Sequence, residues 1–170
     1  SSHYVLTKPG GYAWNTASGS WCDLDEFLAL TDEQKSDERG PAADDSAPEA
    51  PPASPMSSAR AARLERAIAL YRGDYLADDP DAPWANHLRE SLRERLLASI
   101  HELAELRLAQ GQPDAAIALA RHGLEHDHLR EPFYRTLMRA QAEAGDPAGA
   151  LQSYERCRRA LDDELGVTPS

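Results

Sequence analysis

Apolar side chains recur at helical spacing from residue 57 onward, and Gly and Pro divide this pattern into five segments. The first begins at Ser57 or Ser58 and ends near Gly73, and a loop rich in Asp and Pro follows over residues 74–83. The other segments span about residues 83–109, 113–125, 129–144 and 147–164. Apolar spacings of three and four residues are typical of amphipathic helices, and short loops make neighbouring helices antiparallel. The pattern therefore predicts an all-α fold over residues 57–170.

A short motif, Gly-x-Pro-x-x-Ala-aliphatic, occurs twice in this region. The second copy follows the first by the period of a tetratricopeptide-like helical hairpin, roughly 34 residues. We call this offset, from Gly111 to Gly145, the repeat period. Gly permits the turn between two helices, and Pro fixes the start of the second. The four matched pairs are Gly111 and Gly145, Pro113 and Pro147, Ala116 and Ala150, and Ile117 and Leu151.

The matched positions imply how the paired helices pack. We expect the two alanines to lie where the helices approach closely, and Ile117 and Leu151 to fill the groove beside them. The small residues Ala104, Gly123 and Cys157 are compatible with further close contacts. Because one such hairpin cannot hide its apolar face alone, stacked units share a core. The repeat predicts a tetratricopeptide-like helical-repeat superhelix.

Two shorter patterns precede these helices. Strand-forming residues 4–7 and 12–14 flank a Pro-Gly-Gly turn, which predicts a β-hairpin within residues 1–21. A lone hairpin is marginal in water, so we expect it to pack against another element. Residues 22–31 carry an apolar stripe that predicts a short helix with Asp23 as its N-cap.

Residues 32–56 interrupt the helical pattern. This window holds five prolines, and its seven acidic residues outnumber Lys35 and Arg39, the two basic ones. It has no aromatic residue. Such a segment cannot bury enough apolar surface to offset its chain entropy. We therefore predict a disordered acidic linker at residues 32–56, between the short helix and the helical domain at 57–170.

The charge balance argues against the chain as a whole gripping nucleic acid. The formal net charge is −11, from 29 acidic and 18 basic side chains, whereas nucleic-acid binding usually needs a basic face. The acidic linker carries −5 of this charge, so the remainder is more nearly neutral, at −6.

Cysteine usage and apolar content bear on the compartment. Two cysteines far apart favour a reduced, cytoplasmic setting. We expect no membrane contact, because no window of 18 residues is wholly apolar. The chain also lacks an initiator Met, which suggests a piece of a longer protein.

His122, Glu125 and His126 match the H-x-x-E-H pattern of one class of zinc peptidase. On a helix the two histidines would share a face, and Glu125 could act as a base. Against this, the motif lies at the end of a short helix and contains a Gly, and no third ligand is evident. The preferred hypothesis is no metal, no cofactor and no catalytic residue, with a zinc metallohydrolase as the remote alternative.

Two further features have a structural and a functional interpretation. Arg60, Arg63 and Arg66 could meet a phosphate or an acidic partner, but such a run is more often a solvated helix face. Trp84 could stack on a ligand, but we expect it to plug the core at the start of the long helix.

Several stretches resemble the bacterial transcriptional activator domain found in SARP-type and maltose-activator-like ATP-dependent regulators. The most specific are LYRGDYL at 70–76, LREPFYRTLM at 129–138 and LGVTPS at 165–170, and the resemblance covers residues 22–170 apart from the acidic linker. Two departures are His128, where the family usually has Pro, and the length and acidity of the linker. The resemblance implies a tetratricopeptide-like α-superhelix and a role in transcription regulation.

Residues 5–15 resemble the final hairpin of a winged-helix domain. DNA contact is therefore expected mainly through an upstream winged helix absent from this sequence, with a minor share from the DNA backbone at Lys8. The implied role is a non-enzymatic interaction module. Its partner would be a second copy in a homodimer, a neighbouring domain, or the transcription machinery, including RNA polymerase. The first alternative is a ligand-sensing module whose groove binds a small effector.

Overall fold

The computed structural model describes residues 5–9, 11–15, 19, 21–32, 55–79 and 81–169. Helices dominate this part of the chain, which confirms the predicted all-α class. A short 3₁₀ helix, η3 (Pro83–Ala85), leads into the longest of them. The α-helices are α1 (Asp23–Thr31), α2 (Pro55–Leu70), α3 (Asn86–Ala109), α4 (Pro113–His126), α5 (Glu131–Glu143) and α6 (Pro147–Leu165).

The predicted hairpin is present at the N-terminal end. Strands β1 (Val5–Lys8) and β2 (Gly11–Trp14) pair antiparallel, with Lys8 opposite Gly11 next to the turn. Within the described residues, neither strand packs against a helix. The expected contact with another element is therefore not found in this part of the chain.

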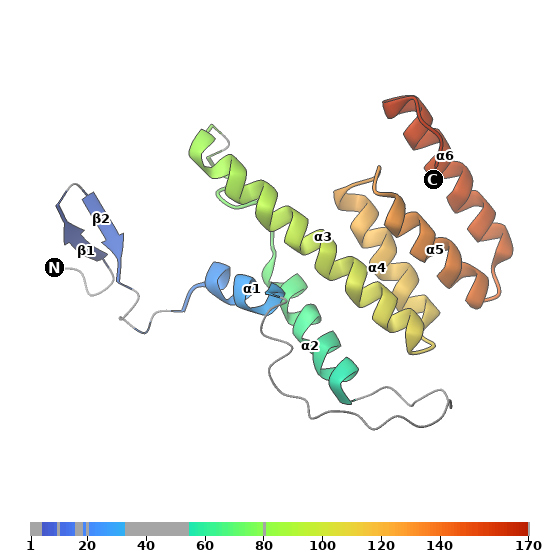
Figure 1. Ribbon diagram of the computed structural model, residues 1–170, viewed down its shortest axis with the longest axis horizontal. Coiled ribbons are helices and arrows are strands. Elements are labelled where there is room, and N and C mark those ends of the chain that lie inside the picture. Colours follow the sequence, from blue (N-terminus) through green and yellow to red (C-terminus); the bar gives the residue numbers. More distant parts are fainter. Residues whose placement is uncertain are drawn as a thin grey trace, which may run out of the picture.

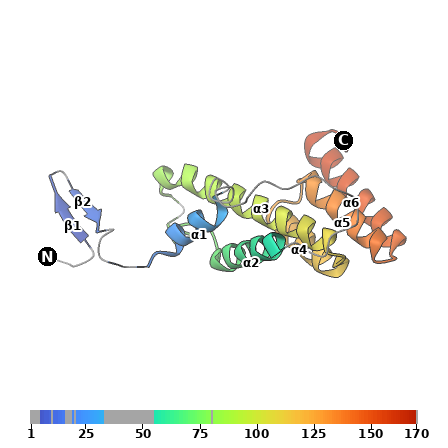
Figure 2. The same cartoon turned by 60° about the horizontal axis from the view of Figure 1, so that its bottom comes forward.

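The helices follow one another in a series of neighbours. Helix α3 packs against α2 and α4, α5 packs against α4 and α6, and α1 packs on α2 and α3. Helices α3 to α6 lie side by side in chain order in both views (Figures 1 and 2). None of the helices in the described segments combines the length and apolarity that a bilayer span requires.

One apolar core runs through the series. Its buried members come from every α-helix and include Phe27, Ala67, Leu96, Ile100, Leu124, Phe133, Leu137 and Leu161. Burying a large apolar side chain contributes about 1.5–3 kcal/mol. A smaller cluster of Leu108, Ala116 and Ala140 closes the turn between α3 and α4. Consecutive helices therefore share side chains in a continuous core.

Three predicted boundaries are wrong. Asp23 is the first residue of α1, whose N-cap is Cys22, and its carboxylate accepts a hydrogen bond from the Leu24 amide at 2.8 Å. Helix α2 ends at Leu70, before Gly73. Gly73 has a φ of +156°, which is far from the αL conformation that closes a helix.

The predicted linker is also shorter by two residues, because α2 begins at Pro55. Pro is favoured in the first turn of a helix, where its missing N–H loses no intrahelical bond. The rest of the prediction, over residues 33–54, lies outside the described residues.

Candidate functional site

The two copied turns have the same backbone. Gly111 and Gly145 adopt the left-handed conformation, with φ of +69° and +79°. The Gly111 amide donates to the Leu108 carbonyl at 2.9 Å, and the Gly145 amide to the Ala142 carbonyl at 3.1 Å. The next residue donates back to Arg107 in the first copy, at 2.9 Å, and to Gln141 in the second, at 2.8 Å. Each bond in one turn has its counterpart one repeat period away.

The second helices of the two pairs also begin alike. Pro113 and Pro147 follow N-cap residues Gln112 and Asp146, whose φ and ψ are −112° and 64° and −111° and 70°. Only the Asp146 side chain closes its cap, by accepting a hydrogen bond from the Gly149 amide at 2.8 Å. The sequence offered a signal for this cap, since Asp is a favoured N-cap residue.

The side chains after the two turns differ in burial. Ala116 is fully buried and Ile117 packs against the core, whereas Ala150 is half-buried. Leu151 is 69% exposed, so the prediction that it fills a groove is wrong. The reason is position, because α4 lies between α3 and α5, whereas α6 has only α5 beside it among the described elements.

The predicted small residues lie at close helix contacts. Gly123 is buried, and a Cβ there would lie 2.3 Å from the ring of Phe133. Ala104 is fully buried. Cys157, one repeat period after Gly123, is buried as well, and burial first, then the charge of Glu131, raises the pKa of its thiol. A raised pKa keeps a thiol protonated and unreactive.

The uncovered side of α6 exposes large apolar side chains. Tyr154 is 42% exposed, and Leu165 and Val167 follow at the end of the helix. Together with Leu151 they form what we call the α6 face, defined by Leu151, Tyr154, Leu165 and Val167. Apolar residues scattered singly are normal on a surface, whereas this helix and the residues after it expose four.

Trp84 corrects a second burial prediction. Its side chain is 69% exposed on η3, while its neighbour Ala85 takes the buried place beside α3. The expected core plug is therefore wrong. On this short 3₁₀ turn Ala85, and not Trp84, is the residue directed toward the core.

The histidine motif forms a pair of rings on α4. The rings of His122 and His126 meet edge to face with centroids 5.0 Å apart, and His122 lies 3.4 Å from the Glu125 carboxylate. Burial, then the positive charges of His122 and Arg93, lower the pKa of His126. Within the described residues, no three His, Cys, Asp or Glu side chains are arranged to hold a metal ion.

The arginines of α2 bind the neighbouring helices. Arg60 makes two hydrogen bonds to the Glu102 carboxylate, at 2.6 and 2.7 Å. Arg63 donates to the carbonyls of Leu30, at 2.7 Å, and Asp32, where α1 ends. Only Arg66 keeps a mostly exposed side chain. The prediction of a solvated face is therefore wrong for the first two.

Paired charges line an open groove along α3. This groove, of about 900 Å³, includes Arg60, Glu94 and Glu102 among its walls. Arg130 binds Glu94 through two hydrogen bonds, at 2.9 and 2.6 Å, and these bonds lower the pKa of Glu94. Both of these carboxylates therefore already have arginine partners.

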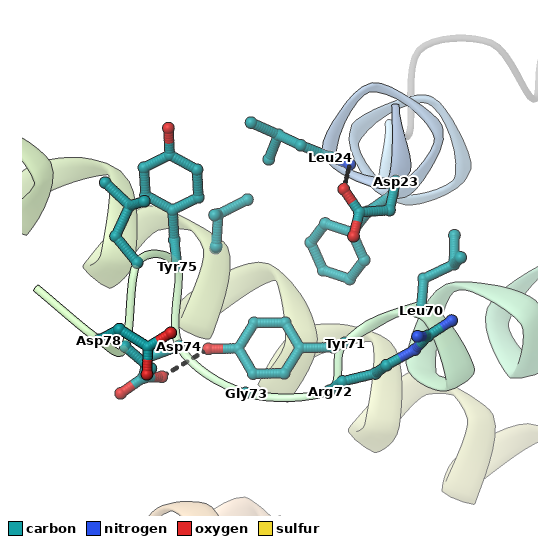
Figure 3. A pocket seen from close by; sticks show the side chains of 13 residues that line it. Asp23, Leu24, Leu70, Tyr71, Arg72, Gly73, Asp74, Tyr75 and Asp78 are labelled. Atoms are coloured by element: carbon teal, nitrogen blue, oxygen red, sulfur yellow. Dashed lines mark hydrogen bonds between the residues drawn. The ribbon is translucent and has the colours of Figure 1, made fainter. Parts of the chain in front are cut away.

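A smaller pocket lies between α1, the turn at residues 70–78 and α3 (Figure 3). It measures about 470 Å³. The Tyr71 side chain lines the pocket, and its hydroxyl donates a hydrogen bond to the Asp74 carboxylate at 2.8 Å. Burial, with this hydrogen bond and the charge of Asp74, raises the pKa of Tyr71 to about 12. Sequence reasoning missed the pocket, because the LYRGDYL stretch at 70–76 that lines it indicated a family resemblance and no ligand chemistry.

Lys8 is exposed at the end of β1, beside the hairpin turn. It shares no contact with the α6 face or with the pocket, since neither strand meets a helix in the described part of the chain. The sequence singles out five places: the repeat, Lys8, the histidine pair, Trp84 and the arginines of α2. The structure does not bring these five places together into one site.

Comparisons with known proteins agree on one family. A family model described as the bacterial transcriptional activator domain matches residues 22–170. The chain is 33% identical over 106 residues to the transcriptional regulator RedD of Streptomyces coelicolor, a match to 62% of this chain and 30% of RedD. It is 36% identical over 106 residues to the regulatory protein AfsR of the same organism, covering 62% of this chain and 11% of AfsR.

A third relative matches the whole chain. The transcriptional regulatory protein MoaR1 of Mycobacterium tuberculosis is 26% identical over 170 residues, which are half of MoaR1. The chain therefore spans half or less of the length of these three relatives.

Proposed function

The chain belongs to the bacterial transcriptional activator domain family, and from this premise we propose that it is the protein-interaction module of a cytoplasmic transcriptional regulator. Its helices would form a tetratricopeptide-like superhelix, as the shared geometry of the two copied turns supports. The role is non-enzymatic, in keeping with relatives named as transcriptional regulators.

The observation that carries this proposal is the α6 face. The first hairpin consists of α3 and α4, and its second helix, α4, is covered by α5. The second hairpin consists of α5 and α6, and on α6 Leu151 and Tyr154 are exposed. Helical repeats bury such a face by stacking a further element on it. The proposed occupant is a second copy of the chain or a neighbouring domain of the regulator, with contacts to RNA polymerase as a further route.

Sedimentation of the protein over a range of concentrations tests self-association. We expect a dimer that the double variant Leu151→Asp and Tyr154→Asp weakens by roughly tenfold or more, because burying an unpaired carboxylate is unfavourable. Gln152→Asp, a charge change at an exposed position on the same helix, is the control. A wild-type chain that stays monomeric, or a dimer unchanged in the double variant, would refute self-association through α6.

The hairpin has a separate proposed role. We propose that β1 and β2 end an upstream winged-helix domain, and that Lys8 touches the DNA backbone from its exposed position. In the full-length regulator, Lys8→Ala should weaken DNA binding by a similar factor for every DNA sequence. The dependence of the DNA affinity on salt concentration should fall by about one phosphate contact. Arg121→Ala, at an exposed position of α4, is the control. An unchanged salt dependence would remove Lys8 from the interface.

A second candidate function, the sensing of a small effector, is favoured by the 470 Å³ pocket. Its volume falls in the range of small-molecule sites, about 300–1,000 Å³. Because α1 forms one wall and α3 another, a bound effector would fix the short helix to the repeats.

A further inference from the structure

We propose that the pocket between α1, the 70–78 turn and α3 binds a small organic cation, an amine or guanidine attached to an aliphatic or aromatic body. This inference rests on the second candidate function, the sensing of an effector, and assigns the chemical class of that effector. It does not depend on what covers the α6 face.

The pocket has an apolar floor. Leu24 and Phe27 come from α1, Leu92 from α3, and Leu70 from the end of α2. The rings of Phe27 and Tyr71 lie 5.9 Å apart with a tilt of 52°. Apolar walls of this kind gain from burying the hydrocarbon part of a ligand.

The charge of the lining selects the head group. Three carboxylates, of Asp23, Asp74 and Asp78, line the pocket with one cation, Arg72. Asp74 lies beside the Tyr71 hydroxyl, which donates to it, and in the view of Figure 3 Arg72 extends away from this hydrogen bond. Hydrogen bonds between a charged donor and a carboxylate are about twice as strong as neutral ones. The mouth of the pocket therefore favours a cation over a neutral group and opposes an anion.

The carboxylate nearest the floor is held in place. Asp74 accepts the Tyr71 hydroxyl hydrogen bond at 2.8 Å, and a Tyr hydroxyl stays a donor at neutral pH. A carboxylate has four acceptor sites. Asp74 can thus accept from a ligand while Tyr71 fixes its orientation.

The rim of the pocket is strained and fixed. Leu76 has a φ of +53°, in the left-handed region that a Leu rarely adopts. Arg89 fastens this turn by donating to the carbonyls of Tyr75, at 2.8 Å, Leu76, at 3.1 Å, and Asp79. Strain of this kind persists where the surroundings over-determine it, and it clusters at ligand sites. Here it places the Leu76 side chain, which is 40% exposed, on the pocket.

Amide NMR spectra of the ¹⁵N-labelled protein test the assignment with three probes of one shape: 2-phenylethylammonium, 2-phenylethanol and phenylacetate. We expect the ammonium probe to shift the amides of Leu24, Tyr71 and Leu76, and to bind about tenfold more tightly than the alcohol. Phenylacetate should leave these amides unmoved. Amide exchange in α1 should slow with the ammonium probe, because the ligand joins α1 to the turn.

Charge-removing variants sharpen the result. Asp74→Asn keeps an acceptor for the Tyr71 hydroxyl, and combined with Asp78→Asn it should reduce the preference for the ammonium probe to about threefold or less. Asp163→Asn, on exposed α6, should keep the full preference. Unchanged melting temperatures of all variants would show that the fold is retained.

The outcomes separate the inference from the function on which it rests. Equal binding of the ammonium probe and the alcohol, or an unchanged preference in the Asp74 and Asp78 variant, overturns the cation assignment and leaves an effector pocket. Shifts confined to residues outside the pocket, or no shift with any probe, overturn both.

Discussion

The two helical hairpins share one turn but differ in their surroundings. The second helix of the first hairpin, α4, is covered by α5, and the second helix of the second, α6, ends the series of described elements. The turn residues therefore have the same backbone one repeat period apart, whereas Ala116 and Ile117 are more buried than Ala150 and Leu151. Local sequence sets the turn, whereas the next element along the chain decides how much each side chain contributes to stability.

The largest expected contrast lies between Phe133 and Val167, which are one repeat period apart. Phe133 is fully buried and Val167 is exposed. Phe133→Ala should lower the free energy of unfolding by about 3–5 kcal/mol, and Val167→Ala by less than about 0.5 kcal/mol. Urea denaturation measures both. Similar losses at the two positions would show that Val167 is as well covered as Phe133.

A smaller effect is expected where α4 meets α5. Gly123→Ala places a methyl group within 2.3 Å of the Phe133 ring, and this overpacking should destabilise the protein by about 1–3 kcal/mol. The loss should largely vanish in a Phe133→Ala background, since the ring is then absent. A double-mutant cycle in urea without such coupling would contradict the close contact.

The two turns should respond equally to a change in either. Gly111→Ala and Gly145→Ala each force a side chain into the left-handed region, at a cost of about 1–2 kcal/mol. Neither new Cβ would meet an atom within 4 Å, so no clash adds to this. Thermal unfolding should show that the two variants lose free energy of unfolding by amounts within about 0.5 kcal/mol of each other. If one variant lost clearly more stability than the other, the two turns would not be energetically equivalent.

The smallest contrast concerns pH. His126 has a lowered pKa in the fold, and its counterpart one repeat period later is Ala160, which does not titrate. As pH falls below about 6.5, the unfolded chain takes up the proton first. Stability should therefore decline toward acid and be retained above that pH. His126→Gln should reduce the difference in urea midpoint between neutral and mildly acidic buffer, and His87→Gln, at an exposed position, should not. If the difference in urea midpoint between the two buffers were unchanged in His126→Gln, His126 would not be a source of the pH dependence of stability.

Features set by local chemistry could be predicted from the sequence. Gly111, Gly145, Pro113 and Pro147 fixed the turns and helix starts, because each acts on its own φ or on one hydrogen bond. Burial was harder. Leu151 and Trp84 carry a strong apolar signal, but whether a neighbour covers them depends on elements elsewhere in the chain.

The pocket shows the same limit for function. Asp74 and Leu76 come from a stretch whose composition predicts only a loop, and Tyr71 lies in what the sequence predicts as the end of a helix. The positive φ of Leu76 has no sequence signature, since Gly or Asn would be usual there. The sequence likewise predicts a surface charge at Arg63, whereas in the structure Arg63 binds the Leu30 carbonyl of α1. Both features arise from contacts between segments distant in sequence.

The hydrogen bonds from Arg63 to Leu30 and Asp32 have an evolutionary consequence. These hydrogen bonds hold the last turn of α1 against α2. The end of α1 at Asp32 and the start of α2 at Pro55 therefore keep a fixed separation, whatever the length of the chain between them. Doubling the length of a loop costs only about 0.6 kcal/mol. Changes in the number of residues between 32 and 55 should therefore leave the short helix in its place on α2.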